Sequence, residues 1–440
     1  MRTDALTSFN SLRDLVARLS ALGCRRVYFK LLAENDNSKQ QIYLGGSFEV
    51  LTLLPFGEVR SDSSAKRPNF KAPVQLFWID VNGAAERAEG AQLILYPKYP
   101  EVRLSGFLAG CRIAPSSDLR HVKSSERAHN NGPDGRVLFF GVDGSSRIFA
   151  YLATRSSHVA REVEEGVERG FASPKGVLWE LHQRGTSRQR LLERLAEIGN
   201  AGWHDGMRLD ARGAPIPYAA QNGGGYTLEA LFGITPNGRS EPDFEGWELK
   251  AYSQDKITLM TPEPDGGYYA LSGVEAFVRK YGVSLERDRM YFRGLHRFGV
   301  QCPATRMTLG LDGFDVARGK MVGVEGGIEL RDEFGELGAK WSFSRLIEHW
   351  GRKHAAAAYV RYQSRDVPSR GYKFLSPVLL GEGADFTRYL VQIARRSVFY
   401  DPGCKIEAAS GRPRTKARSQ FRIAVAQLAS LYEHFERVDY

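Results

Sequence analysis

Cysteine is scarce in this sequence, and long apolar runs are missing. The cysteines among its 440 residues are few and widely spaced: Cys24, Cys111, Cys302 and Cys404. They form no CxxC pair and have no histidine at metal-ligand spacing, which argues against a zinc site or a disulfide framework. No stretch approaches the ~18 apolar residues of a membrane span, and Arg2, Asp4 and Arg13 leave no apolar signal core. We therefore expect a cytoplasmic protein that does not enter a membrane.

The charge balance is basic, and the chain is long. A formal net charge of +10 suits a polyanionic partner such as a nucleic acid, although many soluble proteins are mildly basic without binding one. A chain of 440 residues exceeds the size of one ordinary core, so two domains are expected.

Residues 242–250 read Pro-Asp-Phe-Glu-Gly-Trp-Glu-Leu-Lys and carry the strongest chemical signal. In a β-strand, side chains two residues apart share a face, so Glu248 and Lys250 would converge while their neighbours enter a core. Asp243 has an odd offset from Glu248, and only a bulge at Gly246 or a preceding turn would bring it to the same face. Two carboxylates binding Mg²⁺ beside a lysine suit phosphodiester hydrolysis, since the metal stabilises developing charge and acidifies a water. An amphipathic surface strand would show the same alternation.

A third carboxylate lies upstream of this motif. The spacing predicts a short helix that is capped by Thr227, carries Glu229 and ends near Gly233. Glu229 on a helix beside the strand would complete an acidic cluster, or it would only interact favourably with the helix dipole. Downstream, Lys256–Pro264 predicts a second apolar strand.

These motifs follow one another in an order that resembles the MvaI/BcnI restriction endonuclease family, itself similar to the mismatch-repair nicking enzyme MutH. The resemblance covers about residues 186–440 and is carried by Gly202-Trp203, the Gly-Gly-Tyr-Thr-Leu-Glu run to Glu229, the Asp-x4-Glu-Leu-Lys run and the Thr-Leu-Met-Thr strand. It implies an α/β (α+β) MutH-like PD-(D/E)xK nuclease domain that cuts double-stranded DNA with Mg²⁺.

The resemblance also implies a role for each residue of the motifs. Asp243 and Glu248 would be the metal ligands, Lys250 the catalytic lysine, and Glu229 the helix-borne acidic residue of the site. The spacing between Asp243 and Glu248 is short compared with MutH-like enzymes, so the number of metal ions stays open.

The first half of the sequence has a different pattern. Apolar residues between Phe9 and Leu22 follow helical spacing, and short apolar runs between Gly, Pro and Ser loops then predict a mainly β barrel or sandwich. The predicted strands are Arg26–Leu32, Gln41–Leu44, Val74–Val81, Gln92–Tyr96 and a hairpin over Arg136–Thr154. The run from Phe29 to Leu44 is similar to the start of the B3-like DNA-reading domain of EcoRII-type enzymes. That similarity implies a domain that binds a second DNA copy or a modified base and controls the nuclease.

The pattern predicts a mainly β effector domain over residues 1–175, a helical linker over 176–198 and the nuclease domain over 199–440. The linker would contain helices at Val177–Gln183 and Ser187–Ile198. A further helix is predicted from Trp341 through the alanines to Tyr359.

A basic segment lies near the C-terminus. Gly411–Arg422 holds five cations and no acid, which suits phosphate contact, and Arg or Gln side chains can pair with base edges. A solvated basic loop is the other interpretation. The residues predicted to contact DNA are Arg412, Arg414, Lys416, Arg418, Gln420 and Arg422, together with Lys353 and His354.

Three functions fit the sequence. The first is a Mg²⁺-dependent type II restriction endonuclease with an N-terminal effector domain and a companion methyltransferase. The second is a nuclease that cuts only DNA containing 5-methylcytosine. The third is a non-catalytic DNA-binding regulator, which the intact Asp243, Glu248 and Lys250 set argues against. A two-carboxylate glycosidase would leave the lysine and the basic segment unexplained.

Overall fold

The structure is a computed structural model that describes residues 8–33, 41–119, 133–182, 187–236, 243–286, 289–354, 356–409 and 412–440. The chain divides into two compact units. Unit 1 comprises residues 1–60 and 69–190, and unit 2 comprises residues 61–68 and 191–440. Within the described ranges, no helix has both the length and the apolar character needed to cross a bilayer.

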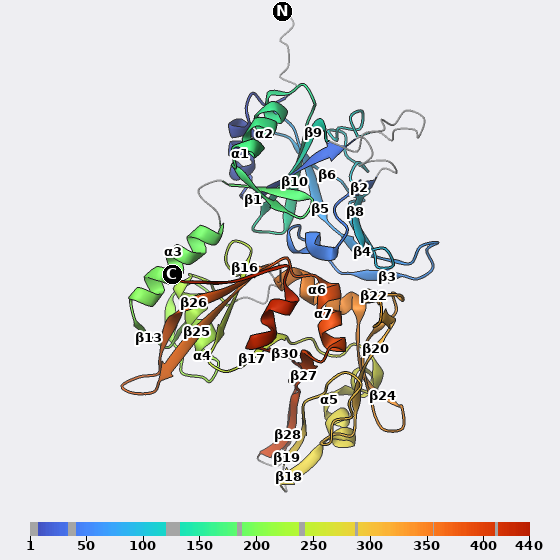
Figure 1. Cartoon of the computed structure of the whole chain (residues 1–440), viewed down its shortest axis with the longest axis vertical. Coiled ribbons are helices and arrows are strands. Elements are labelled where there is room, and N and C mark those ends of the chain that lie inside the picture. Colours follow the sequence, from blue (N-terminus) through green and yellow to red (C-terminus); the bar gives the residue numbers. More distant parts are fainter. Residues whose placement is uncertain are drawn as a thin grey trace, which may run out of the picture. The chain divides into compact units, whose positions relative to one another are not determined.

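Among its described residues, unit 1 contains two β-sheets and two α-helices (Figure 1). The seven-stranded sheet has the order β11-β12-β1-β9-β10-β5-β6, and the five-stranded sheet has the order β2-β8-β7-β4-β3. The elements are α1 (Leu12–Ala21), β1 (Cys24–Ala33), β2 (Gln41–Tyr43), η1 (Phe48–Thr52), β3 (Arg60–Asp62), β4 (Asn69–Pro73), β5 (Gln75–Ile79), β6 (Ala85–Arg87), β7 (Gln92–Tyr96), β8 (Glu101–Ser105), β9 (Pro133–Asp143), β10 (Arg147–Ala153), α2 (His158–Glu168), β11 (Ala172–Lys175) and β12 (Leu178–Leu181).

Helices α1 and α2 pack on one face of the seven-stranded sheet. Leu15 and Leu19 of α1 and Val159 and Val163 of α2 share one buried cluster with strand residues such as Phe139. The helical spacing predicted the N-terminal helix correctly, and the apolar runs predicted β1, β2, β5, β7, β9 and β10. The other described strands of this unit were not predicted.

Two expectations for the first half differ from the structure. Neither sheet closes on itself among the described strands, so a closed B3-like barrel is not confirmed. The predicted helix at 177–183 is wrong, because Leu178–Leu181 forms β12 and pairs with β1 and β11. A short apolar run fits a strand and a helix equally well, and sheet pairing decides between them here.

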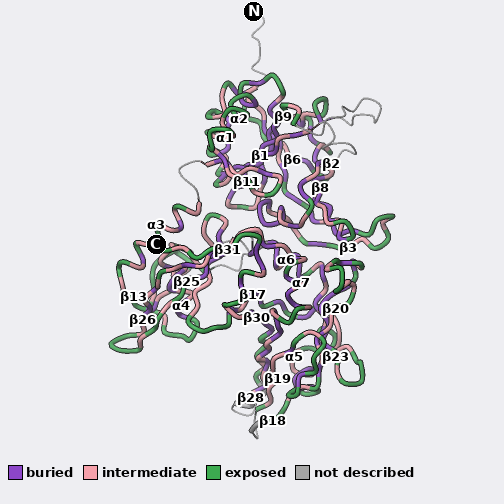
Figure 2. Tube along the Cα trace, viewed as in Figure 1, coloured by how far each residue is buried: buried purple, intermediate pink, exposed green. Residues whose placement is uncertain are grey.

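Unit 2 is built on a mixed sheet with the order β13-β26-β25-β16, and β31 also pairs with β26. Helices α3 and α4 cover one face of this sheet. Leu195 of α3, Leu228 of α4 and Leu249 of β16 belong to one buried cluster. Figure 2 shows the buried stretches running along these strands.

The remaining strands of unit 2 form small sheets: β17-β30-β27, β18-β19-β28-β29, β20-β23-β24, β14-β15 and β21-β22. Its elements are α3 (Ser187–Asn200), β13 (Trp203–Asp205), β14 (Met207–Leu209), β15 (Pro215–Pro217), α4 (Gly223–Leu231), β16 (Trp247–Tyr252), β17 (Lys256–Met260), α5 (Gly267–Tyr281), β18 (Val283–Glu286), β19 (Arg289–Arg293), β20 (Thr308–Asp312), β21 (Phe314–Asp315), β22 (Lys320–Met321), β23 (Gly327–Arg331), β24 (Leu337–Ser342), α6 (Phe343–Lys353), β25 (Ala356–Arg365), β26 (Gly371–Glu382), α7 (Phe386–Ala394), β27 (Val398–Tyr400), β28 (Gly403–Ala409), β29 (Arg412–Lys416), β30 (Phe421–Ala424), η3 (Val425–Leu431) and β31 (His434–Val438).

The predicted helix from Trp341 to Tyr359 is only partly correct. Trp341 lies in β24, which ends at Ser342, α6 begins at Phe343 with Ser342 as its cap, and the alanines belong to β25. Ala357 and Ala358 are fully buried between β16 and β26. Sheet pairing on both sides outweighs the helical preference of alanine.

Helix α4 begins at Gly223, earlier than expected. Thr227 is therefore not its cap but a buried interior residue, whose hydroxyl forms hydrogen bonds with the backbone of Met207.

Tyrosine side chains from the sheet explain the glycine run at the start of α4. A Cβ at Gly224 would lie 2.5 Å from the Tyr362 ring, whereas a Cβ at Gly225 meets nothing within 4 Å.

We expect Gly224→Ala to destabilise the protein by about 1–3 kcal/mol, because the added methyl overpacks the contact with Tyr362. Gly225→Ala is the matched control and should be neutral or stabilising, since it adds helix propensity in open space. Urea unfolding of both variants checks the prediction. Equal midpoints would contradict close packing of α4 on the sheet.

Candidate active site

A two-residue turn brings Asp243 back toward the strand that carries Glu248. Phe244 and Trp247 exchange both backbone hydrogen bonds, with N···O distances of 2.9 and 2.8 Å. Both intervening residues have positive φ angles, 45° and 95°, as in a type I′ hairpin turn. Extending this pairing by one residue sets Asp243 opposite Glu248, and opposite residues of a hairpin share a face. The turn therefore accounts for the odd offset of Asp243.

Hydrogen bonds hold the acidic and basic groups of this hairpin together. The backbone N–H of Leu249 donates to Oδ2 of Asp243 at 2.8 Å, and Nζ of Lys250 donates to Oε1 of Glu248, also at 2.8 Å. Trp247 and Leu249 enter the core on the other face, as the alternation predicted. Only 4% of the Glu248 side chain is exposed, compared with 22% of Lys250, so the ion pair opens to solvent at its lysine end.

The charges around Lys250 keep it protonated. Burial by itself would lower the pKa of Lys250, but the carboxylates of Glu248 and Asp243 together outweigh burial, and the pKa is raised. Lys250 is therefore a hydrogen-bond donor and a positive charge at neutral pH.

Two tyrosines lie behind this ion pair, and no motif of the sequence pointed to them. Tyr359 is in register with Lys250 across the β16–β25 pairing, and its hydroxyl lies 2.6 Å from that of Tyr432. Burial raises the pKa of Tyr359 to about 12 and that of Tyr432 well above its usual value, so both stay neutral. Gly381 makes room for this pair, because a Cβ there would lie 2.5 Å from the Tyr432 ring.

The carboxylates of Asp243 and Glu248 fit a Mg²⁺ ion. This ion prefers oxygen ligands and commonly takes one or two carboxylates, with waters and substrate phosphates completing its shell. Among the residues that the structure describes, no three Asp, Glu, His or Cys side chains are placed to share one ion. Glu229, half-buried on α4, therefore does not form a three-carboxylate metal site with the other two, and its catalytic role stays a prediction.

Comparison with known proteins gives a family match that spans this hairpin. Residues 192–432, more than half of the chain, match the sequence profile of the MvaI/BcnI restriction endonuclease family. The chain belongs to this family. It is a site-specific deoxyribonuclease of the type II restriction class. Unit 2, called the nuclease unit below, contains all of the matched residues.

Solved structures of one restriction endonuclease are also similar. MvaI in complex with its cognate DNA substrate has 16% sequence identity and a TM-score of 0.45, covering 58% of this chain and 99% of that chain. MvaI in the absence of DNA has the same identity and coverage and a TM-score of 0.33. No match was found among curated proteins.

The predicted DNA-contact residues fall into three groups. Arg414, Lys416 and Arg418 are exposed on or beside β29. Three others point inward: Gln420 is buried beside Thr258, Arg422 forms an ion pair with Asp401, and His354 is buried against Trp350. The side chains of Lys353 and Arg412 lie outside the described residues, as does Pro242 of the motif.

The turn itself is testable, because a type I′ turn favours Asn-Gly and penalises a Cβ at its second position. We expect Gly246→Ala, at φ 95°, to lower cleavage activity by displacing Asp243, with a loss of stability of about 1 kcal/mol. Glu245→Asn should preserve both properties and serves as the matched control. Rates of DNA cleavage and thermal melts check the pair. Full activity in Gly246→Ala would contradict the role of the turn.

Metal binding should be visible as stability. We expect Mg²⁺ to raise the melting temperature of the wild type, by the equivalent of about 2.7 kcal/mol at 100 times Kd, and to leave Asp243→Ala unshifted. Glu229→Ala should keep the shift if Asp243 and Glu248 are the only protein ligands. A wild-type melting temperature independent of Mg²⁺ would contradict the proposed ligands.

Proposed function

We propose that the protein is a Mg²⁺-dependent type II restriction endonuclease that hydrolyses double-stranded DNA at a short specific sequence. The observation that carries this proposal is the hairpin of residues 243–250, which brings Asp243, Glu248 and Lys250 together around a type I′ turn. The match to the endonuclease family supports it.

Each residue of the hairpin has a distinct task in the proposed reaction. Asp243 and Glu248 would hold the ion, which when bound supplies charge stabilisation and lowers the pKa of a water. Lys250, protonated beside Glu248 and open to solvent, would donate hydrogen bonds to the phosphate or to the attacking water. Tyr359 and Tyr432 close the rear of the site and exclude water there. We propose 5′-phosphate and 3′-hydroxyl ends as the products.

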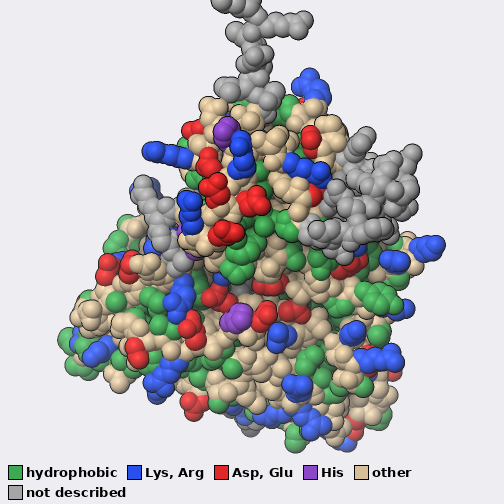
Figure 3. Space-filling model, turned by 45° about the horizontal axis from the view of Figure 1, so that its top comes forward, with side chains coloured by type: hydrophobic (Ala, Val, Ile, Leu, Met, Phe, Trp, Pro, Cys, Tyr) green, Lys and Arg blue, Asp and Glu red, His purple; other side chains and the backbone are tan. Residues whose placement is uncertain are grey.

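Basic side chains of the nuclease unit offer DNA contacts. Figure 3 shows Lys and Arg side chains spread over the visible face of the molecule and mixed with carboxylates. Because no purely basic patch stands out on that face, we use strand register to find cations that share one side of a sheet. Lys416 lies opposite Lys405, Arg414 opposite Glu407, and Glu407 opposite Arg289. Opposite residues share a face, so Lys405, Arg414, Lys416 and Arg289 lie on one face of this sheet together with Glu407, and we propose that this face contacts phosphates.

We further propose that unit 1 acts as a DNA-binding effector domain, as the B3-like resemblance of its first strands implies. A second DNA copy and a modified base are both candidate ligands of this unit. If the modified base is 5-methylcytosine and licenses cutting, the protein is a modification-dependent endonuclease. A companion methyltransferase is expected only if methylation blocks cutting.

Cleavage of plasmid DNA tests the proposal. Wild-type protein and Glu248→Ala are incubated with methylation-free and with cytosine-methylated plasmid, in Mg²⁺ or in EDTA. We expect discrete fragments from unmodified DNA only with Mg²⁺, and a rate at least about 10²-fold lower in the variant. Fragments only from methylated DNA would favour the modification-dependent enzyme. Equal cleavage by Glu248→Ala would contradict the site, and binding without cleavage of either DNA would favour the regulator.

A further inference from the structure

Two arginines lie on the active-site face of the main sheet, beyond the hairpin. Tyr252 follows Lys250 by two residues on β16 and is paired in parallel with Arg361 of β25. Lys250, Tyr252 and Arg361 therefore point to one side of the sheet, because residues two apart on a strand share a face. The sequence analysis singled out neither Tyr252 nor Arg361, since Arg361 follows a run of alanines that resembles a helix.

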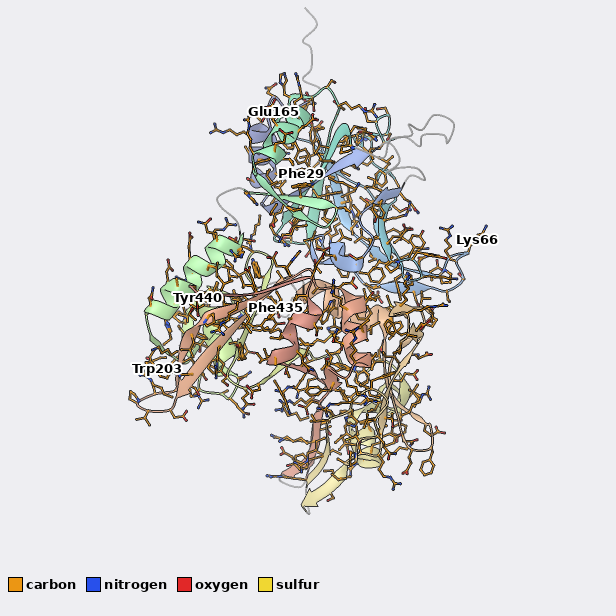
Figure 4. The ribbon with its side chains drawn as sticks, in the orientation of Figure 1. Phe29, Lys66, Glu165, Trp203, Phe435 and Tyr440 are labelled. Atoms are coloured by element: carbon orange, nitrogen blue, oxygen red, sulfur yellow. The ribbon has the colours of Figure 1, made fainter. Side chains whose placement is uncertain are left out.

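The second arginine reaches this face from the opposite edge of the sheet. Tyr359 is paired with Leu379 of β26, which in turn is paired with Arg437 of β31. Lys250, Tyr359, Leu379 and Arg437 thus form one row across four strands, with their side chains on the same face. In Figure 4, the labelled Phe435 of β31 and Trp203 of β13 mark two ends of this sheet.

The charges of Arg361 and Arg437 converge near Tyr252. Burial raises the pKa of the Tyr252 hydroxyl, and the positive charges of Arg361 and Arg437 both act on that hydroxyl and oppose the shift. The two arginines therefore lie close to one point, although they come from strands separated by β26.

Nothing in the described part of the chain neutralises this arginine pair. Both side chains are exposed, and neither guanidinium makes a hydrogen bond or ion pair with a described residue. Other arginines of the nuclease unit do have such partners, for example Arg279 with Glu275, Arg306 with Glu333 and Arg370 with Asp366. Two like charges held close together without a carboxylate favour an anion.

We propose that Arg361 and Arg437 bind backbone phosphates of the DNA strand that is cut, next to the phosphate held at Lys250. The guanidinium group suits phosphate because it donates two parallel hydrogen bonds to its oxygens. Tyr252 lies beside Arg361, two residues beyond Lys250 on β16, and Tyr359 and Leu379 lie between Lys250 and Arg437 in their row. This inference rests on the proposed nuclease function and adds the contacts that fix the register of the strand at the site.

The same face continues as a basic surface away from the site. Lys373 is paired with Gln363 of β25, and the guanidinium of Arg365 stacks over the exposed ring of Trp203 at 4.8 Å. Two carboxylates, Asp205 and Asp439, lie farther along and accept hydrogen bonds from serine side chains. Cations therefore predominate between the catalytic lysine and the far end of the sheet.

Salt dependence of DNA binding tests the proposal. The affinity for a short DNA duplex of mixed sequence is measured without Mg²⁺ at several salt concentrations, for the full chain and for Arg361→Ala, Arg437→Ala and the double variant. Each lost phosphate contact should reduce the slope of log Kobs against log[salt] by about 0.9 and weaken binding about tenfold. Arg361→Lys should restore the slope, since lysine keeps the charge.

Arg194→Ala is the matched control. It removes a cation from α3, on the other face of the same sheet, and should leave the slope unchanged. If the salt-dependence slope is unchanged in both Arg361→Ala and Arg437→Ala while the protein cleaves plasmid with Mg²⁺, the phosphate contacts proposed here are wrong and the proposed nuclease function stands. Reduced slopes in a protein that cleaves no DNA would sustain the phosphate contact and overturn the proposed function instead.

Discussion

The alternation of side chains along β16 is the constraint on which the rest of the site depends. Trp247 and Leu249 are buried against α3 and α4, which fixes the register of this edge strand. A slip of one residue would exchange the faces, placing Glu248 in the apolar core and removing Lys250 from solvent. The large apolar side chains therefore position the charged ones, although they take no part in the chemistry themselves.

The same constraint organises the surroundings of the site. Burial of Glu248 is tolerable because Lys250 pairs with it, and isolated buried charges are strongly unfavourable. Tyr359, Arg361 and Arg437 belong to the same face of the sheet, and Tyr432 contacts Tyr359 from outside the sheet. One sheet surface therefore carries the proposed metal ligands, the neutral Tyr359 and the proposed phosphate contacts. The type I′ turn adds Asp243 without any further element.

Sequence reasoning predicted the parts of the site that lie within one strand and missed those that depend on pairing. The two-residue period of a β-strand predicts that Glu248 and Lys250 share a face and that their neighbours are buried. The position of Asp243 depends instead on positive φ angles at Glu245 and Gly246, and a Glu-Gly pair is a weak signal for such a turn. Arg361 lies near the site because of the register between β16 and β25, and Tyr432 because it follows the 3₁₀ helix η3. No local sequence pattern predicts either position. Thr227 and the alanines of β25 were misassigned because tertiary packing outweighed local propensity.

We propose that Glu248 and Lys250 of the hairpin act as one unit in catalysis. A double-mutant cycle on the rate of DNA cleavage tests this most directly. Single-turnover rates are compared for wild type, Glu248→Gln, Lys250→Met and the combined variant, with enzyme in excess over DNA. Residues that act together are strongly non-additive. We expect the double variant to be no slower than the slower single variant. A double variant whose loss equals the product of the two single losses would show that the two side chains act independently, and would contradict a shared site.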